Sequence, residues 1–138
     1  KDDYLKEFIE KLFIGYRESF NDPKKILNKY SLGIAHHKAI HLISLHQGIT
    51  ISQLLGKLKV KKQSINRVIK DLISLDEKKK KKGEKDTRLK HVFLTKKGNQ
   101  IFNEIFFAQK KRIYKALINS SSIEINSFNN VLKKIINE

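Results

Sequence analysis

The 138-residue chain is long enough for one domain with a modest hydrophobic core. Its 30 Lys and Arg against 14 Asp and Glu give a formal net charge of +16, which indicates a polyanionic partner, either nucleic acid or an anionic membrane surface. Because the chain has no Cys, disulfides, thiolate catalysis and Cys-ligated zinc or iron–sulfur sites are excluded.

The sequence also bears on location and composition. No apolar run approaches the roughly 20 residues of a membrane span, and no signal-type segment opens the chain, so we expect a cytoplasmic protein. The chain starts at Lys1 and contains no Met, so we expect a slightly longer gene product. The basic segments adjoin no apolar face, which argues against membrane binding. The Lys, Asn and Ile bias also fits an A·T-rich genome, which is an alternative explanation for part of the charge.

The first third of the chain predicts three helices. Apolar residues recur at helical spacing over residues 4–20. Asp22 and Pro23 are typical of a helix cap and of a first helical position, so a short helix is predicted over residues 23–29. A further apolar series predicts a helix over residues 35–46.

A helix-turn-helix pattern follows. Thr50 and Gln53 form a capping-box sequence, in which each side chain can satisfy an amide at the start of the helix. We predict that this helix ends in a turn at residues 59–61. A second helix is predicted over residues 61–75, with one apolar face and an opposite face of cationic and amide side chains.

The next segment predicts a basic hairpin, or wing. Residues 76–86 are polar, with a Lys run at residues 78–82 and a turn at Gly83. Residues 88–94 form a strand candidate in which Val92 and Leu94 face the same way.

Two long helices are predicted to end the chain. Thr95 caps the helix over residues 96–118, and a second capping box at residues 121–124 opens the helix over residues 122–137. Together with residues 4–20, these helices have wider apolar faces than one small core needs. Packing on each other within one chain is the simpler alternative, but we expect a homodimer, because large exposed apolar patches usually mark interfaces.

The polar face of the second helix carries side chains that can read DNA. Gln63 and Asn66 can each make two hydrogen bonds to adenine, and Arg67 can make two to guanine. Ser64 suits a base or a phosphate, and the lysines suit phosphates because each is a point charge on a long stem. The candidate DNA contacts are Lys61, Lys62, Gln63, Ser64, Asn66, Arg67, Lys70, Lys80, Lys82, Lys85 and Arg88.

Arg88 and Asp86 have a separate predicted role in the wing. Arg88 suits a minor groove, where narrow A·T-rich sequence concentrates negative potential. Asp86 lies two residues away, on the same side of an extended strand, so we expect it to orient Arg88. A solvated Lys-rich surface explains residues 78–82 about as well as DNA contact does, but it explains the mixture of amides and cations on the helix less well.

These motifs resemble a known family. Asp86-Thr87-Arg88 with Leu94-Thr95-Lys96-Lys97-Gly98 resembles the D-x-R…L-T-x-x-G signature of MarR-type winged-helix regulators. The resemblance covers nearly the whole chain and is greatest to the PetP-like branch, through residues 13–17, 22–23, 33–37 and 62–68. It implies a homodimer with interlocked outer helices, pseudo-palindromic operators, and Arg88 at the wing tip paired with Asp86. Residues 76–78 depart from the family's apolar first wing strand, which predicts a short strand.

The sequence therefore predicts a mainly α fold with a small β-wing. We expect a single domain over residues 1–138, with a winged helix-turn-helix core at residues 34–98 and dimerisation helices at residues 1–33 and 99–138. The expected function is a sequence-specific regulator of transcription that binds double-stranded DNA as a homodimer. A nonspecific, basic nucleoid-associated protein is the alternative, which the charge of +16 suggests.

A small-molecule effector is compatible with the resemblance, and His36, His37 and His41 are the candidate pocket. His37 and His41 are one helical turn apart, a geometry that can chelate a metal or face a haem. Without a clear third ligand we expect neither a metal nor a cofactor, and interhelical hydrogen bonding near the dimer axis is the alternative role. Histidines also predict pH-dependent DNA affinity. Because no G-x-S-x-G, P-loop or H-E-x-x-H motif is present, we expect no enzyme activity.

Overall fold

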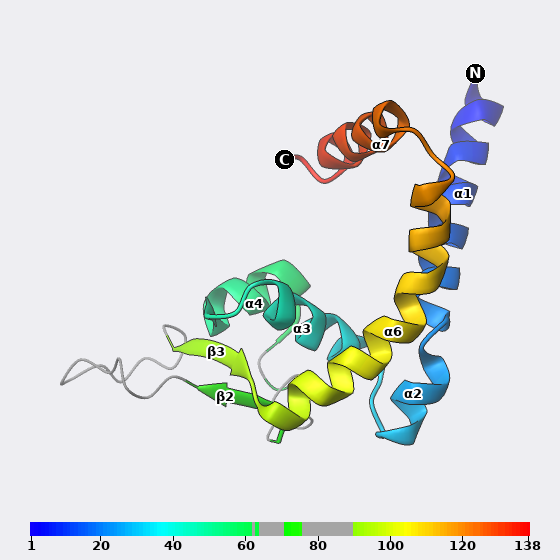
Figure 1. The fold of residues 1–138 in the computed structure, drawn as a ribbon. Coiled ribbons are helices and arrows are strands. Elements are labelled where there is room, and N and C mark those ends of the chain that lie inside the picture. Colours follow the sequence, from blue (N-terminus) through cyan, green and yellow to red (C-terminus); the bar gives the residue numbers. More distant parts are fainter. Residues whose placement is uncertain (62, 64–70, 76–89) are drawn as a thin grey trace. The chain divides into compact units, whose positions relative to one another are not determined.

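The computed structural model describes residues 1–61, 63, 71–75 and 90–138 of the chain, as a mostly helical fold with a small sheet (Figure 1). The chain divides into two compact units. The first comprises Lys1–Asp22 and Phe107–Glu138, and the second comprises Pro23–Phe106. The described elements are α1 (Asp2–Asn21), α2 (Lys24–Lys29), α3 (Ile34–Leu45), β1 (Ile49–Thr50), α4 (Ile51–Leu58), β2 (Ile73–Leu75), β3 (His91–Leu94), α6 (Lys96–Ile118) and α7 (Ser122–Ile135).

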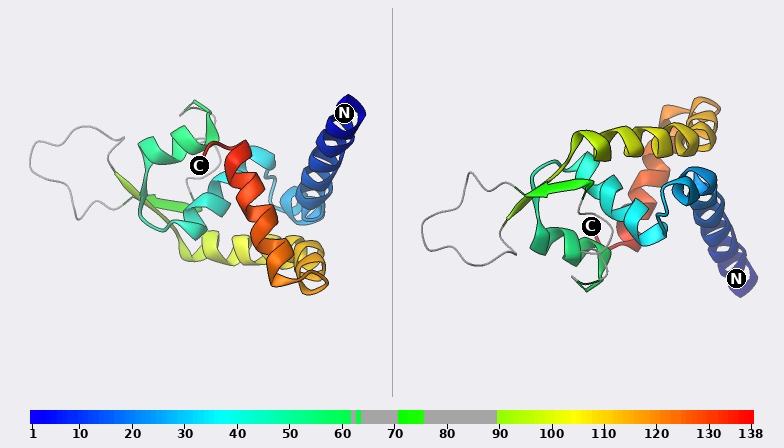
Figure 2. Two further views of the ribbon diagram at one scale, coloured as in Figure 1. Left: turned by 90° about the horizontal axis from the view of Figure 1, so that it is seen from above. Right: turned by 90° about the horizontal axis from the view of Figure 1, so that it is seen from below.

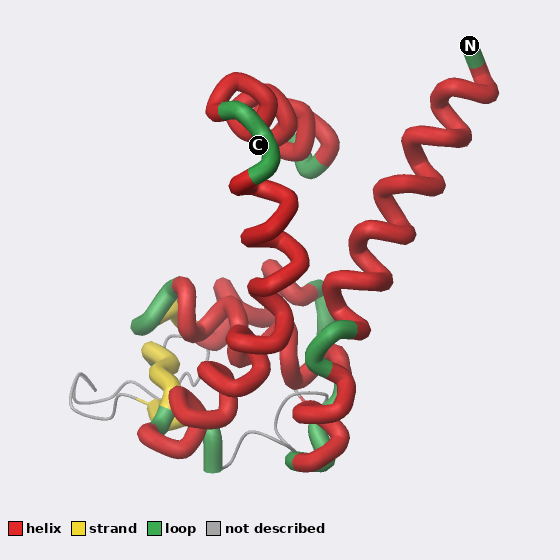
Figure 3. The backbone as a smooth tube through the Cα atoms, turned by 45° about the vertical axis from the view of Figure 1, so that its right-hand side comes forward, coloured by secondary structure: helices red, strands yellow, loops and turns green. Residues whose placement is uncertain are grey.

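The sheet of the second unit is antiparallel, and its strand order is β1-β3-β2. Ile49 pairs with Val92 on one side of β3, and Ile73 pairs with Leu94 on the other. Figure 2 shows β2 and β3 side by side, and Figure 3 draws the strands in yellow. Val92 and Leu94 are both buried, so the prediction that they face the same way is confirmed.

The core of the second unit lies between α3, the sheet and the first part of α6. Ala39, Ile40 and Ile43 on α3 are fully buried, and so is Ile105 on α6. Their spacing along each helix follows from the helical period, which brings residues three and four apart to one face. The other buried hydrophobic residues include Leu27, Leu32, Ile49, Leu54, Leu72, Val92, Leu94, Ile101 and Phe102.

In the first unit, polar contacts join the C-terminal end of α1 to the later part of α6. The guanidinium of Arg112 donates two hydrogen bonds to Asp22, Nε to Oδ2 at 2.7 Å and Nη2 to Oδ1 at 3.0 Å. Hydrogen bonding from Arg112 lowers the pKa of the Asp22 carboxyl. Gln109 donates from Nε2 to the Ser19 carbonyl at 3.2 Å. In contrast to the second unit, α1 and α7 contain no fully buried residue.

Two predictions about local structure are wrong. Residues 73–75 form β2 instead of the end of a helix over residues 61–75, because Ile73 and Leu75 pair with β3 and sheet pairing overrides the helical pattern. Asp22 does not cap α2, whose N-cap is Pro23 without a side-chain hydrogen bond, because the Asp22 carboxylate is bound by Arg112. β1 is not predicted from the sequence, because a strand of two residues is too short to show a period.

The remaining helix predictions are close to the structure. α1 begins two residues earlier than predicted, α3 is displaced by one residue, and α7 ends at Ile135. Both capping boxes are confirmed, with Thr50 and Ser121 as the N-cap residues. Among the described residues, no helix has both the length and the apolar character needed to cross a membrane.

Alanine substitutions at two positions on α3 should differ strongly in their effect on the free energy of unfolding. We expect Ile40→Ala to lower the free energy of unfolding by about 2–5 kcal/mol, because it removes a fully buried side chain and leaves a cavity. Leu45→Ala is the matched control on the same helix, since Leu45 is 68% exposed, and it should cost less than about 0.5 kcal/mol. Urea unfolding of both variants measures the difference, and equal losses would contradict this description of the core.

Candidate nucleic-acid interface

The interface is built on α4, the first helix of the predicted helix-turn-helix. Its start is fixed by the capping box: the Thr50 amide donates to Gln53 Oε1 at 3.1 Å, and the Gln53 amide donates to Thr50 Oγ1 at 3.1 Å. Leu54 is buried, and Ile51 and Leu58 pack against the core. The apolar face of α4 therefore anchors the helix, and its remaining faces stay accessible.

A left-handed residue turns the chain at the end of α4. Lys59 has φ 53° and ψ 44°, and its amide donates to the Leu55 carbonyl at 2.8 Å. This is the geometry of a helix C-cap in the left-handed region, which non-glycine residues adopt only at some cost. The turn leads to Lys61 and Gln63, and both side chains are exposed.

Most predicted DNA contacts are outside the part of the chain that the structure describes. Lys61 and Gln63 are described, and Gln63 has helical backbone geometry. The predicted contacts outside the described residues are Lys62, Ser64, Asn66, Arg67, Lys70, Lys80, Lys82, Lys85 and Arg88, together with the wing-orienting Asp86. The assignment of these side chains to DNA therefore remains a prediction from the sequence.

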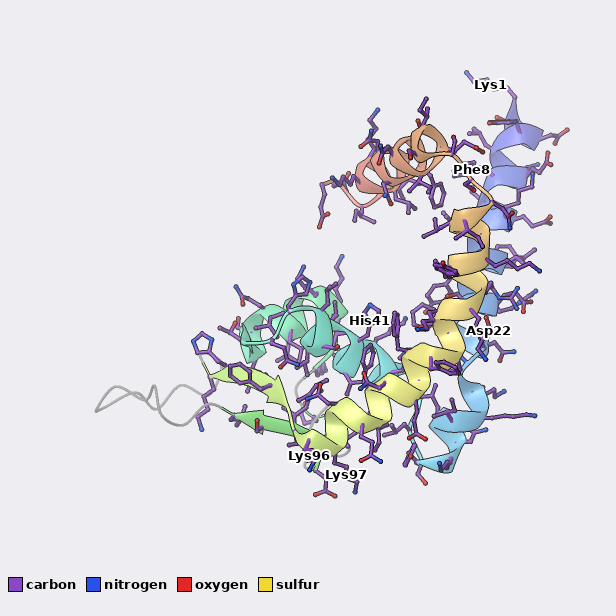
Figure 4. The ribbon with its side chains drawn as sticks, in the orientation of Figure 1. Lys1, Phe8, Asp22, His41, Lys96 and Lys97 are labelled. Atoms are coloured by element: carbon purple, nitrogen blue, oxygen red, sulfur yellow. The ribbon has the colours of Figure 1, made fainter. Side chains whose placement is uncertain are left out.

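Four exposed lysines at the end of α4 and the start of α6 are not among the DNA contacts predicted from the sequence. Lys57 and Lys59 are exposed on either side of the end of α4, next to the turn. Lys96 and Lys97 are exposed at the start of α6 (Figure 4). Lys97 lies 3.9 Å from the Asp71 carboxylate, which leaves Lys96 as the more available cation. Lys57 and Lys59 could have been identified from the sequence, because a lysine recurs at every second position, 57, 59 and 61, at the predicted end of the helix.

Net charge is concentrated in the second unit. Residues 23–106 carry 20 Lys and Arg against 6 Asp and Glu, a net charge of +14, whereas residues 1–22 and 107–138 carry 10 against 8, a net charge of +2. Basic residues are more frequent in the second unit, 20 of 84 residues against 10 of 54. Acidic residues are only about half as frequent there, 6 of 84 against 8 of 54, and this scarcity is the larger part of the difference. A codon bias toward Lys does not explain that scarcity, whereas a polyanionic partner for the second unit does.

The three candidate histidines occupy the N-terminal half of α3, in different settings. His37 is fully buried, and its ring centroid lies 6.5 Å from that of His41 in an edge-to-face arrangement. His41 also lies edge-to-face on Phe102, with centroids 5.7 Å apart. His36 instead accepts a hydrogen bond at Nδ1 from the Gly33 amide at 2.9 Å, at the start of the helix. Within residues 1–61, 63, 71–75 and 90–138, no three His, Cys, Asp or Glu side chains are grouped as metal ligands.

Burial makes two of these histidines harder to protonate. Burial lowers the pKa of His41, and the charge of nearby His46 lowers it further. Burial also lowers the pKa of His36 from 6.5. In addition, protonating Nδ1 of His36 would remove the lone pair that accepts the Gly33 amide.

The protein should therefore lose stability in mild acid. The unfolded chain takes up protons near pH 6.5 while the folded histidines stay neutral, so the free energy of unfolding falls as the pH drops below about 6.5. The lowered pKa values of Asp22 and Glu124 act only below their ordinary values of 3.8 and 4.5, outside this window. Urea midpoints measured between about pH 7.5 and pH 5.5 should decline, and the decline should be shallower in the His36→Asn/His41→Gln variant. A midpoint that stays constant or rises would contradict the assignment.

Comparisons with known proteins place the chain in a family. No family model matches it. It is 36% identical over 135 residues to the HTH-type transcriptional regulator PetP of Rhodobacter capsulatus, covering 98% of this chain and 81% of that protein. Two solved structures share the fold with a TM-score of 0.71. One is Staphylococcus aureus MarR in complex with salicylate and kanamycin, 21% identical over 98% of this chain and 94% of that chain. The other is a MarR family regulator from Silicibacter pomeroyi, 16% identical over 98% and 89%.

These likenesses confirm both the predicted fold, a mainly α winged helix-turn-helix with flanking helices, and the expectation that the chain is a regulator and not an enzyme. The identity to PetP over nearly the whole chain is decisive for the family, because the structural neighbours by themselves show only the fold. The protein belongs to the MarR family of winged helix-turn-helix regulators of transcription.

Proposed function

We propose that this regulator acts as a homodimer that binds pseudo-palindromic operators in double-stranded DNA, in the cytoplasm. The observation that carries the proposal is the net charge of +14 on the unit that contains the helix-turn-helix, against +2 on the other unit. A duplex carries one negative charge per about 1.7 Å of its axis, so a unit of this charge gains affinity by releasing counterions.

In this proposal the residues of the second unit divide into two roles. Gln63, Asn66 and Arg67 contact base edges in the major groove, because amides pair with adenine and a guanidinium pairs with guanine. The lysines hold phosphates and set the register of the protein on the duplex. The phosphate contacts are Lys61, Lys62, Ser64, Lys70, Lys80, Lys82 and Lys85, and Arg88 enters a minor groove with Asp86 as its partner.

The second copy is proposed from the exposed apolar side chains of the first unit. Phe8 on α1 is more than a third exposed (Figure 4). Phe128 on α7 is about half exposed. The exposed large apolar residues of this unit are Tyr4, Leu5, Phe8, Ile9, Phe13, Tyr16, Phe107, Ile113, Tyr114, Leu117, Ile118, Ile123, Phe128, Val131, Ile135 and Ile136. So many exposed apolar side chains exceed what a monomeric protein usually leaves in water. We assign residues 1–33 and 99–138 to dimerisation and residues 34–98 to DNA binding.

A dimer also fits the geometry of the target. Two copies of a reading helix contact successive major grooves when they are about 34 Å apart, one turn of B-form DNA. Twofold symmetry of the protein then requires a pseudo-palindromic site. The specificity of such a site is the product of two half-sites, which a single helix-turn-helix does not supply.

An effector is the least constrained part of the proposal. The Staphylococcus aureus neighbour is described in complex with salicylate and kanamycin, which is a property of that protein. For this chain we propose that a small molecule modulates DNA binding, with His36, His37 and His41 as the candidate pocket. The buried ring of His37 and the half-buried ring of His41 offer aromatic surface, and Nδ1 of His36 accepts a hydrogen bond from the Gly33 amide.

Sequence-specific DNA binding is tested by comparing the affinity of the protein for two duplexes. Genomic fragments captured by the protein define the operator, and the protein should bind it at least about 10³-fold more tightly than random duplex of equal length at fixed salt. Equal affinities would favour the nucleoid-associated alternative. Arg67→Ala should cost about 1–3 kcal/mol on the operator and little on random DNA. Arg17→Ala, which removes an exposed arginine of α1, is the matched control and should leave both affinities unchanged.

The test of dimerisation places charge on the apolar faces. Ile9→Glu and Phe128→Glu should each raise the dimer dissociation constant at least about tenfold, or about 1.4 kcal/mol, because a carboxylate loses its hydration when it is buried in an interface. Lys6→Glu on α1 changes the charge at an exposed polar position and should have a smaller effect. Sedimentation over a concentration series measures the constant, and a wild-type protein that remains monomeric at micromolar concentration would rule out the proposed dimer.

A further inference from the structure

Asp71 and Leu72 directly follow residues 62–70, the expected reading segment, and Thr95 at the start of α6 donates hydrogen bonds to both. The Thr95 hydroxyl donates to the Asp71 carbonyl at 2.7 Å, and the Thr95 amide donates to the Leu72 carbonyl at 2.9 Å. The Thr95 hydroxyl also accepts the Gly98 amide at 3.0 Å, which caps α6. The Thr95 hydroxyl therefore caps α6 and also binds the backbone that follows residues 62–70.

Gly98 lets these two segments approach closely. A Cβ at this position would lie 3.1 Å from the Leu72 carbonyl carbon and 3.2 Å from its Cα, and it would collide with the carbonyl oxygen. These are backbone atoms, which a rotamer change does not move aside. Leu72 is itself buried in the core, so the carbonyl cannot retreat without displacing a packed side chain.

We propose that Thr95 and Gly98 are positioning residues for sequence-specific DNA binding. They act by holding the backbone of Asp71 and Leu72, and thereby the C-terminal end of the reading segment, in place on the second unit. The proposal rests on the proposed function, since it takes residues 62–70 as the reading segment. β2 begins at Ile73, immediately after Leu72, and is paired to β3 through Leu94. Residues 71–75 are therefore held at their start by hydrogen bonds from Thr95 and at their end by pairing with β3.

The physical consequence concerns specificity more than total affinity. Hydrogen bonds to base edges depend on placement within a fraction of an ångström, whereas a lysine on a long stem follows a phosphate over a wider range. Displacing the end of the reading helix should therefore weaken base contacts and leave the charge-driven attraction intact. A loss of folded protein would lower both together, and that difference separates positioning from stability.

The experiment uses full-length protein and two probes: a duplex selected by the wild type from a random library, and a scrambled duplex of the same length and composition. Gly98→Ala should lower the preference for the selected duplex at least about tenfold, with affinity for the scrambled duplex within about twofold and an unchanged salt dependence. Thr95→Val should do the same, because it removes the hydroxyl at nearly constant shape. Thr95→Ser retains the hydroxyl and should recover most of the preference.

Gly56→Ala is the matched glycine control, since a Cβ there meets no atom within 4 Å. Its preference should equal that of the wild type. Hydrogen exchange without DNA is the second readout: the Thr95 amide and those of β2 should exchange faster in Gly98→Ala than in Gly56→Ala.

Each outcome decides one of the two claims. A wild-type protein that selects no sequence would overturn the proposed sequence-specific function. Separately, amides of Thr95 and β2 that exchange no faster in Gly98→Ala would overturn the claim that Thr95 and Gly98 hold residues 71–72. If the wild type selects a sequence and Gly98→Ala keeps its full preference, only the positioning role fails. Parallel loss on both duplexes would show that Thr95 and Gly98 serve stability alone.

Discussion

The organisation of the second unit depends on the pairing of one short strand. β3 pairs with β1 through Val92 and Ile49, and with β2 through Leu94 and Ile73. β1 leads directly into α4, and β2 follows directly after the segment expected to read DNA. Both ends of the helix-turn-helix are therefore tied to the same four residues, and the two inward side chains of those residues are packed in the core. A reading helix needs such a fixed frame, because base contacts tolerate little displacement.

The sequence predicted the fold class and most helices because long amphipathic periods and capping boxes are local signals. Thr50 with Gln53 and Ser121 with Glu124 show this most directly, since each box lies within four residues. What it could not predict depended on partners distant in the chain. Residues 73–75 have no local signal of their pairing with β3, so their pattern predicts helix. Asp22 has the local signature of a cap, because the residue that binds it, Arg112, lies 90 positions away.

The candidate site divides in the same way. The residue types that suit DNA could be read from the polar face of one predicted helix, because the choice of amide and guanidinium groups is a local property. The hydrogen bonds from Thr95 to the Asp71 and Leu72 carbonyls could not be predicted, since they join residues more than twenty positions apart and end on backbone oxygens. A glycine three residues after a helix cap is an ambiguous signal in sequence, and only the approach of the Leu72 carbonyl gives it a reason.

The first unit differs from the second, because many of its large apolar side chains are exposed and few are buried. α1 and α7 have clear helical periods, yet the two helices contain no fully buried residue, and hydrogen bonds and ion pairs join the C-terminal end of α1 to the later part of α6. Exposed ion pairs of this kind contribute little, so they do not account for two long ordered helices. In the proposed homodimer, a second copy would bury these exposed apolar side chains, and the stability of the unit would then depend on protein concentration. The same surface that completes the fold would thus set the spacing of two reading helices, so folding and operator geometry would have one physical origin.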